Sequence, residues 1–348
     1  MSIFASRRKK ALSLAGGKDL VAATGANLFW LTGFWGSGAG VVHDDRTVIV
    51  TSILEEDRAN ELGKEVEVIA VGRWAEVPTT LVKQLHRKVA LVDDDRELRA
   101  TGRFTAKPDL FLEARRVKEE TEVERIRKAS RGLDRIFEEL PSLLKPGATE
   151  WEVAAEVMRL ATLNELTPSG SDSSLSPTII ASGENGALPH SELTRRKMRE
   201  GDFVVADIFF RYDGYNSDAT RTFAVGSATP EMKKHYRVVQ EAQEAALALI
   251  RPGTPCMDVH NGAVEVLRKH RLEKYLNHSI GHGVGIDIHE LPPINRVNKG
   301  RLLENDVVTD EPGIYFKGKY GIRIEDTVKT ARKSEVLTRF TKDLVVTG

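Results

Sequence analysis

One pattern that occurs twice in the second part of the chain most strongly constrains its fold. A predicted helix ends at Pro146-Gly147, and another ends 106 residues later at Pro252-Gly253. A new helix start follows each, with Thr149 and Glu152 at capping-box spacing in the first copy and Pro255 at the first helical position in the second. Each copy then leads into a hairpin that carries two acids. We therefore expect two similar halves related by a pseudo-two-fold axis.

Residues 203–223 form the first predicted hairpin. Asp213-Gly214 is a two-residue turn signal between two runs that are typical of β-strands. This turn makes Asp207 oppose Thr220 and places Asp218 one diagonal step away on the same face. Two carboxylates are therefore expected to project from one side of the hairpin.

Asp207 stands inside an otherwise apolar strand. A buried, unpaired carboxylate is costly unless a cation or a proton neutralises it, so this position favours a metal site. The simpler alternative is an ion pair of Asp207 with Arg211 or Arg221, with Asp218 as a turn cap. The pattern of this hairpin alone does not decide between the two.

Residues 307–329 form the second predicted hairpin. Glu311 and Glu325 are symmetric about Gly318, so two strands joined by a short loop would place them opposite each other. A surface hairpin with solvated acids is the simpler alternative. The repeat nevertheless brings two acids from each half together, and four adjacent negative charges repel one another strongly. Two divalent cations would neutralise them, and we therefore expect a dinuclear metal site.

Histidines offer further ligands. His278, His282 and His289 fall within 13 residues of a glycine-rich segment, where glycine lets the backbone approach a ligand closely. His190 precedes Asp207 by 17 residues and could reach the same face. A lone histidine is more often a structural residue, but three in one glycine-rich segment favour a site.

Composition excludes several classes of protein. Lys and Arg number 51, as do Asp and Glu, so no basic excess favours binding to nucleic acid or to an anionic membrane. No apolar run reaches the roughly 18 residues of a membrane span, and the apolar stretch after residues 7–10 is too short for a signal peptide. The single cysteine, Cys256, excludes an internal disulfide and a multi-cysteine metal site. We expect a cytoplasmic protein.

The first third of the chain alternates short apolar runs with polar helical patterns, which is typical of an α/β domain. Strands are expected over residues 20–23, 40–42, 47–51, 66–71 and 89–92, and helices over residues 27–32, 53–62 and 74–87. A long amphipathic helix is expected over residues 117–144. We place the domain boundary near Glu113, which gives an N-terminal domain at residues 1–112 and a second domain at residues 113–348.

The ordered motifs resemble the proline-specific branch of the pita-bread metallopeptidases, the Xaa-Pro aminopeptidases and prolidases. The segments that carry the resemblance are residues 116–122, 217–222, 278–290, 311–315 and 323–326. It covers residues 113–348 closely, whereas residues 1–112 match only in pattern. The resemblance implies an α/β N-terminal domain like that of creatinase and an α+β pita-bread catalytic domain with an internal repeat.

The resemblance also implies a ligand set of five residues for two divalent ions per subunit: Asp207, Asp218, His282, Glu311 and Glu325. Asp218 and Glu325 would bridge both ions. An oxygen-rich set with one imidazole suits Mn²⁺ or Co²⁺, with Zn²⁺ also possible.

Other residues are implied to act on the substrate. His190 and His289 would contact it and stabilise the tetrahedral intermediate, and Glu311 would also act as a catalytic base. Arg323, Tyr215 and Phe209 are further candidates for substrate contact or for support of the ligands. Phe209 departs from the family, which usually has glycine at this position.

The implied activity is hydrolysis of the peptide bond before proline, in a peptide or dipeptide with proline at the second position. We favour a Xaa-Pro dipeptidase, or prolidase, because the compact length resembles that of short microbial prolidases. The alternative is a Xaa-Pro aminopeptidase that acts on longer peptides. Methionine aminopeptidases share the ligand set but usually lack a domain like residues 1–112.

A non-catalytic binding protein with the same fold is disfavoured, because all five ligand positions hold residue types that bind metal. Creatinase, which uses the fold without metal, is disfavoured for the same reason. The resemblance further implies a homodimer. From the balanced charge and the lack of a long apolar run, we expect it to bind neither nucleic acid nor membrane.

Overall fold

The computed structural model describes residues 2–44, 46–94, 96–169, 176 and 178–348. Their contacts divide the chain into two compact units, Met1–Arg115 and Arg116–Gly348. The boundary expected at residue 112/113 falls within helix α5 (Pro108–Arg116). Within the described residues, no helix is long and apolar enough to cross a membrane.

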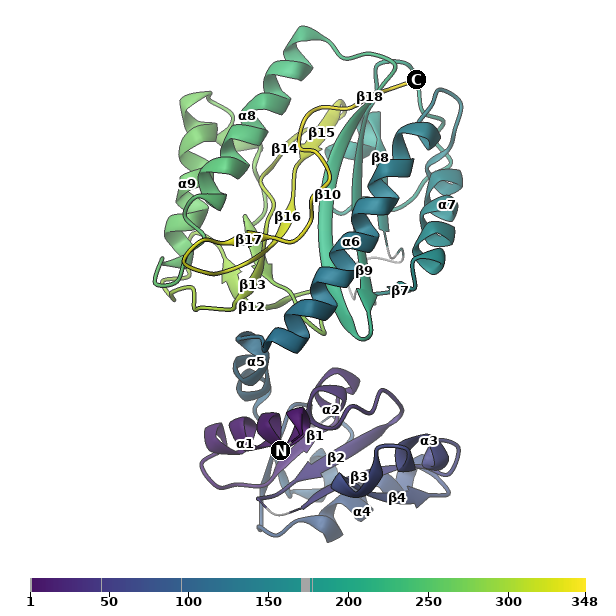
Figure 1. The fold of residues 1–348 in the computed structure, drawn as a ribbon, viewed down its shortest axis with the longest axis vertical. Helices are drawn as coiled ribbons and strands as arrows, with labels where there is room; N and C mark the ends of the chain where they lie inside the picture. The colour runs from purple at the N-terminus through teal and green to yellow at the C-terminus, as the bar shows by residue number, and fades with distance from the viewer. Residues whose placement is uncertain (1, 45, 95, 170–175, 177) are drawn as a thin grey trace. The chain divides into compact units, whose positions relative to one another are not determined.

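The first unit is built on a six-stranded mixed sheet (Figure 1). Its strands are β1 (Leu20–Ala22), β2 (Gly38–Val42), β3 (Thr47–Ser52), β4 (Glu67–Val71), β5 (Ala90–Val92) and β6 (Phe104–Ala106). They lie in the order β4-β3-β2-β1-β5-β6, and β1 runs parallel to β5 but antiparallel to β2. The helices are α1 (Ile3–Leu14), α2 (Gly25–Thr32), α3 (Glu56–Asn60), α4 (Val77–Gln84) and α5.

The expected α/β pattern is present in this unit, but β6 and α5 were not predicted. Strand β6 has only three residues, too few to show a strand period. Helix α5 begins at Pro108, and a proline at the first helical position was a signal that could have revealed it. The helix expected at residues 53–62 is shorter in the structure, where α3 covers Glu56–Asn60.

The second unit places two helix pairs around three small sheets. Its helices are α6 (Glu120–Leu143), α7 (Glu150–Leu163), α8 (Pro230–Leu247) and α9 (Cys256–Lys269). Its first strands are β7 (Thr167–Pro168), β8 (Thr178–Ser182), β9 (Phe203–Tyr212) and β10 (Tyr215–Val225). The later strands are β11 (Gly281–Gly283), β12 (Glu290–Ile294), β13 (Val307–Asp310), β14 (Gly313–Phe316), β15 (Tyr320–Arg323), β16 (Asp326–Lys329), β17 (Glu335–Val336) and β18 (Val346–Thr347).

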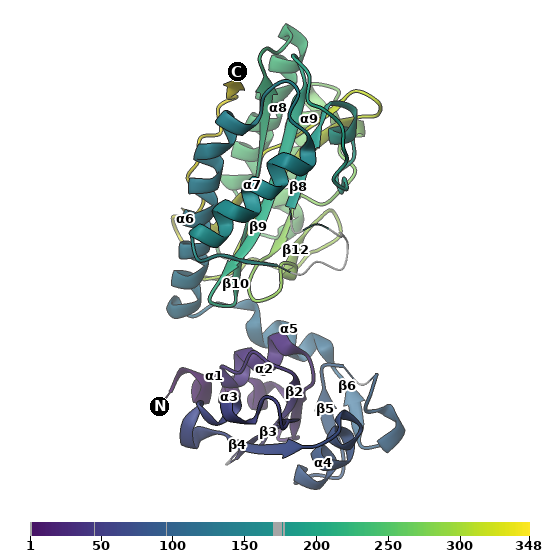
Figure 2. The same ribbon diagram turned by 90° about the vertical axis from the view of Figure 1, so that its right-hand side faces the viewer.

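Each helix pair covers its own sheet and closes a separate apolar core. Helices α6 and α7 pack against β8, β9 and β10, and Figure 2 shows α7 beside β8 and β9. Helices α8 and α9 pack against the later strands on the other side (Figure 1). The long helix α6 forms because Val123, Ile126 and Leu133 recur at helical spacing and are fully buried.

The internal repeat is visible in matching backbone contacts. After the first Pro-Gly, the Gly147 N–H donates to Met198 O at 2.9 Å. After the second, the Gly253 N–H donates to Leu302 O at 2.8 Å. Both glycines have positive φ, 92° and 87°, a conformation that glycine adopts without a steric penalty. The two halves therefore begin with the same turn, held in the same way.

The first hairpin has the register that the sequence predicts. Tyr212 pairs with Tyr215 across the turn, and Asp207 opposes Thr220. Phe209 directly opposes Asp218, so both project from the face that carries Asp207.

The second hairpin differs from the prediction, because its two acids do not face each other within one continuous ladder. Strand β13 pairs with β16, and β14 pairs with β15, with both ladders symmetric about Gly318 as expected. Between them, the Glu311 N–H donates to Ile280 O at 2.7 Å, and the Glu325 N–H donates to Thr220 O at 3.0 Å. These contacts with other segments break the ladder where the acids stand.

Candidate metal centre

The acids of both hairpins and the histidine-rich segment meet at one cavity of about 220 Å³ in the second unit. All five residues predicted to bind metal line it: Asp207, Asp218, His282, Glu311 and Glu325. The candidates for substrate contact that line it are His190, His289, Arg323 and Phe209. A cavity of about 520 Å³ in the first unit is larger, but it holds no comparable cluster of acids.

Tyr215 is the one candidate that the structure does not bring to this cavity. Its side chain is buried, and its hydroxyl donates to Glu122 Oε1 at 2.7 Å. The two residues link β10 to the first turn of α6, 93 residues apart in sequence. Tyr215 lies beside the hairpin turn, and its contact supports the hairpin rather than the cavity.

Threonine hydroxyls hold three of the acids in place. Thr220 Oγ1 donates to Glu325 Oε2 at 2.6 Å, and Thr309 Oγ1 donates to Glu311 Oε1 at 3.3 Å. The backbone of Asp218 is fixed by the Thr327 hydroxyl, which donates to Asp218 O at 2.7 Å. Each contact fixes a carboxylate or its backbone before any ion is bound, as a preorganised site requires.

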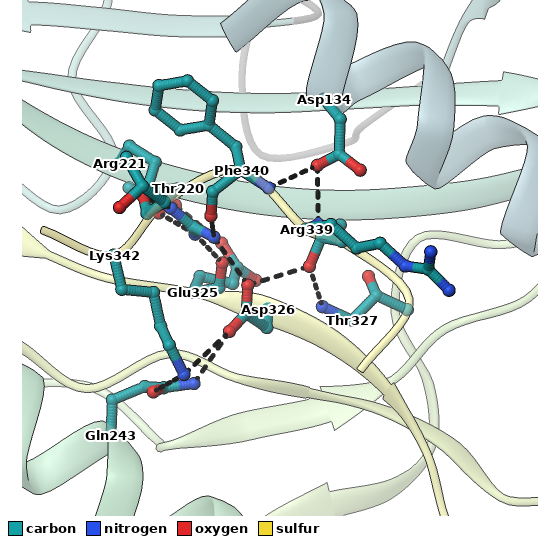
Figure 3. A network of polar contacts seen from close by, with 12 residues as sticks. Asp134, Thr220, Arg221, Gln243, Glu325, Asp326, Thr327, Arg339, Phe340 and Lys342 are labelled. Atoms are coloured by element: carbon teal, nitrogen blue, oxygen red, sulfur yellow. Dashed lines mark hydrogen bonds and ion pairs between the residues drawn. The ribbon is translucent and has the colours of Figure 1, made fainter. Parts of the chain in front are cut away.

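A polar network around Asp326 joins the two hairpins (Figure 3). Asp326, next to Glu325, accepts hydrogen bonds from Arg221 at 2.8 Å and from Gln243 at 3.1 Å. The same Arg221 guanidinium donates to the carbonyl of Glu325. Lys342 adds a positive charge 3.6 Å from Asp326. The network fixes the backbone of Glu325 relative to β10, the strand that carries Asp218.

His282 offers a bare nitrogen to the acids. Its Nδ1 lies 3.0 Å from Gly283 O, which can only accept, so Nδ1 carries the proton and Nε2 does not. Nε2 lies 3.4 Å from Glu311 Oε1 and 3.8 Å from Asp218 Oδ2. Burial lowers the pKa of His282 to about 3, which keeps the ring neutral. A lone pair that faces carboxylate oxygens is an arrangement that a cation between them would satisfy.

Two carboxylate oxygens at the cavity lack partners. Asp207 Oδ1 and Asp218 Oδ1 are buried and have no hydrogen-bond partner among the described residues. Candidate ligand atoms of Asp218, His282 and Glu325 all lie within 4.8 Å of one another. Buried polar atoms normally have partners, so these oxygens and the imidazole fit a divalent cation.

The acids also perturb one another. Burial, followed by the charges of neighbouring carboxylates, raises the pKa of Asp218 and of Glu325 well above the usual values. Burial raises the pKa of Glu311 to about 7. Without a cation the cluster therefore holds protons at neutral pH, and bound cations would displace them.

The simpler alternative for Asp207 is wrong, because neither Arg211 nor Arg221 pairs with it. Arg211 donates to Pro168 O, and Arg221 pairs with Asp326. The partner of Asp207 is Arg323, whose Nη2 donates to Asp207 Oδ2.

Arg323 also donates to the Tyr315 hydroxyl at 2.6 Å. Tyr315 in turn lies 3.0 Å from Nε2 of His278, which lines the cavity. Neither Tyr315 nor His278 was given an individual role from the sequence. The three-histidine segment was the signal for His278, and residues 311–315, which carry the family resemblance, were the signal for Tyr315.

Two family models match the chain. The model described as metallopeptidase family M24 matches residues 124–330, and the model described as the creatinase/prolidase N-terminal domain matches residues 7–101. Together they confirm the predicted fold class, an α/β N-terminal domain followed by a pita-bread domain with an internal repeat.

Relatives and a solved structure agree with the models. The probable dipeptidase PepE of Mycobacterium tuberculosis is 40% identical over 221 residues, which span 63% of this chain but only 57% of that protein. The Xaa-Pro dipeptidase of Pyrococcus furiosus is 32% identical over 328 residues, 92% of each chain. The crystal structure of the prolidase from Pyrococcus horikoshii OT3 matches with a TM-score of 0.89 and 29% identity, covering 98% of this chain and 100% of that one.

Removing a carboxylate predicted to bridge both ions should release both. Each protein is loaded with Mn²⁺ and then dialysed to remove unbound metal. We expect Asp218→Ala and Glu325→Ala to lose both ions, whereas the wild type retains two ions per chain. Elemental analysis of the dialysed proteins measures this. Glu335→Gln, which removes a carboxylate paired with Arg127 outside the cavity, should retain both ions. Two ions per chain in either alanine variant would contradict the ligand assignment.

The raised pKa of Glu311 gives the metal-free protein a pH-dependent stability. Its folded pKa of about 7 lies above the ordinary value of 4.5, so its contribution is fully present below 4.5 and is lost as pH rises through 7. Between pH 5 and 8, the free energy of unfolding of metal-free wild type should fall by roughly 3 kcal/mol relative to Glu311→Gln.

Denaturant titrations of both proteins at each pH measure this difference, and the contributions of the buried histidines largely cancel between them. Saturating Mn²⁺ should abolish the fall, because a cation stabilises the ionised carboxylate. If the free energy of unfolding of wild type minus that of Glu311→Gln stays constant or rises with pH, Glu311 is already ionised in the metal-free fold.

Proposed function

The chain belongs to metallopeptidase family M24, and we propose that it is a metal-dependent Xaa-Pro dipeptidase whose ligands are Asp207, Asp218, His282, Glu311 and Glu325. The observation that carries the proposal is the convergence of four carboxylates and one neutral imidazole on a single cavity, with Asp207, Asp218 and Glu325 buried and Glu311 half-buried. Divalent cations held there would supply Lewis-acid activation of a water nucleophile and of the substrate carbonyl.

The chain's own residues handle the protons. Glu311 accepts the proton of the attacking water and passes it toward the leaving nitrogen. Its raised pKa, about 7, suits a group that must both take up and release a proton near neutrality. Cleavage turns the proline nitrogen from an amide into a secondary amine, and the proton that Glu311 took from the water completes this amine.

Histidines at the cavity complete the proposed machinery. His190 and His289 line the cavity and hold the substrate carbonyl and its developing negative charge. Burial lowers the pKa of His289, so the neutral ring acts as a hydrogen-bond donor rather than as a cation. Arg323 holds Asp207 in place through Nη2 and is therefore a supporting residue rather than a substrate contact.

The size of the cavity favours a short substrate. Its volume of about 220 Å³ is below the range of about 300–1,000 Å³ that is typical of pockets for drug-sized ligands. Phe209 lines the cavity beside Asp218, its cross-strand neighbour, and is only 6% exposed. We propose that this side chain limits the space beyond the proline of the substrate.

Other parts of the assignment remain predictions. The donor set favours Mn²⁺ or Co²⁺ over Zn²⁺ because oxygen ligands predominate. A homodimer and a cytoplasmic location are expected from the sequence analysis, and gel filtration with light scattering would measure the first.

Hydrolysis of a Xaa-Pro dipeptide should depend on metal and on substrate length. We expect chelated enzyme to be inactive, Mn²⁺ to restore activity, and kcat/KM for Ala-Pro to exceed that for Ala-Pro-Gly by about tenfold or more. Chromatographic quantification of released proline measures hydrolysis of Ala-Pro, and quantification of released alanine measures hydrolysis of Ala-Pro-Gly. Ala-Gly serves as the control without proline.

The alternatives are distinguished by the same assay. Equal or faster hydrolysis of Ala-Pro-Gly would favour the Xaa-Pro aminopeptidase. Hydrolysis of neither peptide with Mn²⁺, Co²⁺ or Zn²⁺ would indicate a non-catalytic binding protein.

Shortening Phe209 should relax the limit on substrate length. In Phe209→Ala, we expect the ratio of kcat/KM for Ala-Pro-Gly to that for Ala-Pro to rise on the order of tenfold, because the cavity gains room. Phe210→Ala is the matched control, since Phe210 is fully buried in the core formed with α6 and α7. Both variants should lose about 3 kcal/mol of stability or more, so only a change of the ratio confined to Phe209→Ala supports the assignment. An unchanged ratio there would refute it.

A further inference from the structure

Glu150, a buried carboxylate outside the cavity, holds the segment that carries His190. It is the first residue of α7 and is fully buried. Its Oε1 accepts hydrogen bonds from Ser182 N at 2.7 Å and from Ser182 Oγ at 2.8 Å. Its Oε2 accepts from Thr194 N at 2.9 Å, from Thr194 Oγ1 at 2.6 Å and from Asn185 Nδ2 at 2.9 Å. A helix N-terminus adds a favourable field for this charge.

The residues that donate to Glu150 lie at both ends of residues 182–194, the segment that carries His190. Ser182 is the last residue of β8, and Thr194 lies four residues beyond His190. Each end therefore binds the same carboxylate, and the intervening chain is closed into a loop. Closing both ends on one fixed point restricts the conformations available to the residues between them.

Asn185 carries this restraint toward His190. While its side chain donates to Glu150, its carbonyl accepts a hydrogen bond from Ser191 Oγ at 2.6 Å. The same Ser191 hydroxyl lies 2.7 Å from Leu188 O, on the other side of His190 in sequence. Leu188 and Ser191 flank Pro189-His190. Both are thus connected to Asn185, whose side chain is held by Glu150.

The segment meets the proposed metal centre at Pro189 and His190. Both residues line the cavity, and Pro189 O accepts a hydrogen bond from Arg323 Nη1 at 3.3 Å. His190 itself is exposed, so its own packing does little to fix it. Its position must come from the backbone that carries it.

We propose that Glu150 is a positioning residue that acts through His190, by fixing residues 182–194 so that the imidazole faces the substrate. This inference rests on the proposed peptidase function. Glu150 does not line the cavity and is not a candidate ligand, so its effect on turnover must pass through the segment.

Glu150→Gln tests the proposal with little change of shape. If the amide oxygen keeps the contacts to Ser182, the NH₂ group replaces the oxygen that accepts from Thr194 and Asn185. An N–H that faces an N–H cannot form a hydrogen bond, so the far end of the segment is released. We expect kcat/KM for Ala-Pro to fall on the order of 10- to 100-fold, with bound metal unchanged.

Glu152→Gln is the matched control. Glu152 lies in the same helical turn and forms a capping box with Thr149, and among the described residues its hydrogen bonds are made with Thr149 and not with residues 182–194. It should leave kcat/KM unchanged. Thr194→Val provides a second variant at an exposed position. It removes the hydroxyl that donates to Glu150 and accepts from the Arg196 N–H, and it should produce a smaller loss in the same direction.

A double-mutant cycle with His190→Ala separates positioning from general stability. If Glu150 acts through His190, Glu150→Gln should have no further effect on kcat/KM in the His190→Ala background. Equal losses in both backgrounds would overturn the proposal. Amide hydrogen exchange of residues 183–194 should be faster in Glu150→Gln than in wild type or Glu152→Gln, and unchanged exchange would also overturn it.

Failure of the proposed function would be recognised separately. If wild type with metal hydrolyses no Xaa-Pro peptide, the peptidase proposal fails. The NMR signals of the His190 imidazole, identified by their loss in His190→Ala, then decide the inference without activity. They should shift in Glu150→Gln and not in Glu152→Gln, and signals that coincide with those of wild type would refute the positioning role.

Discussion

The second unit is organised around negative charge that cannot be neutralised by protein groups alone. Asp207, Asp218, Glu311 and Glu325 are drawn together from two hairpins, and burial raises the pKa of the last three. Arg323 compensates part of the charge on Asp207. The remaining unpartnered oxygens and the bare nitrogen of His282 leave a place that suits cations. The threonine contacts and the network around Asp326 hold this arrangement against its own repulsion.

Local patterns in the sequence were sufficient to predict the turn and the register of the first hairpin. Asp213-Gly214 fixes the turn, and the turn fixes which residues oppose each other, so the pairing of Asp207 with Thr220 follows from chemistry within a few residues. The second hairpin obeys the same symmetry about Gly318, yet its ladder is broken at the acids. That break depends on Ile280 and Thr220, which are distant in sequence, and so no local pattern could predict it.

The partners of buried polar side chains were the least predictable feature. Asp207 pairs with Arg323, 116 residues away, although Arg211 and Arg221 stand closer in sequence. The Tyr215 hydroxyl donates a hydrogen bond to Glu122, across a helix–strand contact, and does not reach the cavity. Such partners are chosen by tertiary packing, where a buried polar group takes whichever donor the fold brings within reach. Sequence motifs identified the candidate site residues, whereas the tertiary fold determined which of them are hydrogen-bond partners.

The matching turns at Gly147 and Gly253 have a consequence for how cation affinity depends on protein concentration. A polypeptide with only one half would carry two of the four acids, so binding a pair of ions would require two such chains to associate. Joining the halves covalently makes that encounter intramolecular, and the second pair of acids is then present at a high effective concentration. At a fixed concentration of free cation, loading with metal would therefore not depend on the concentration of the protein.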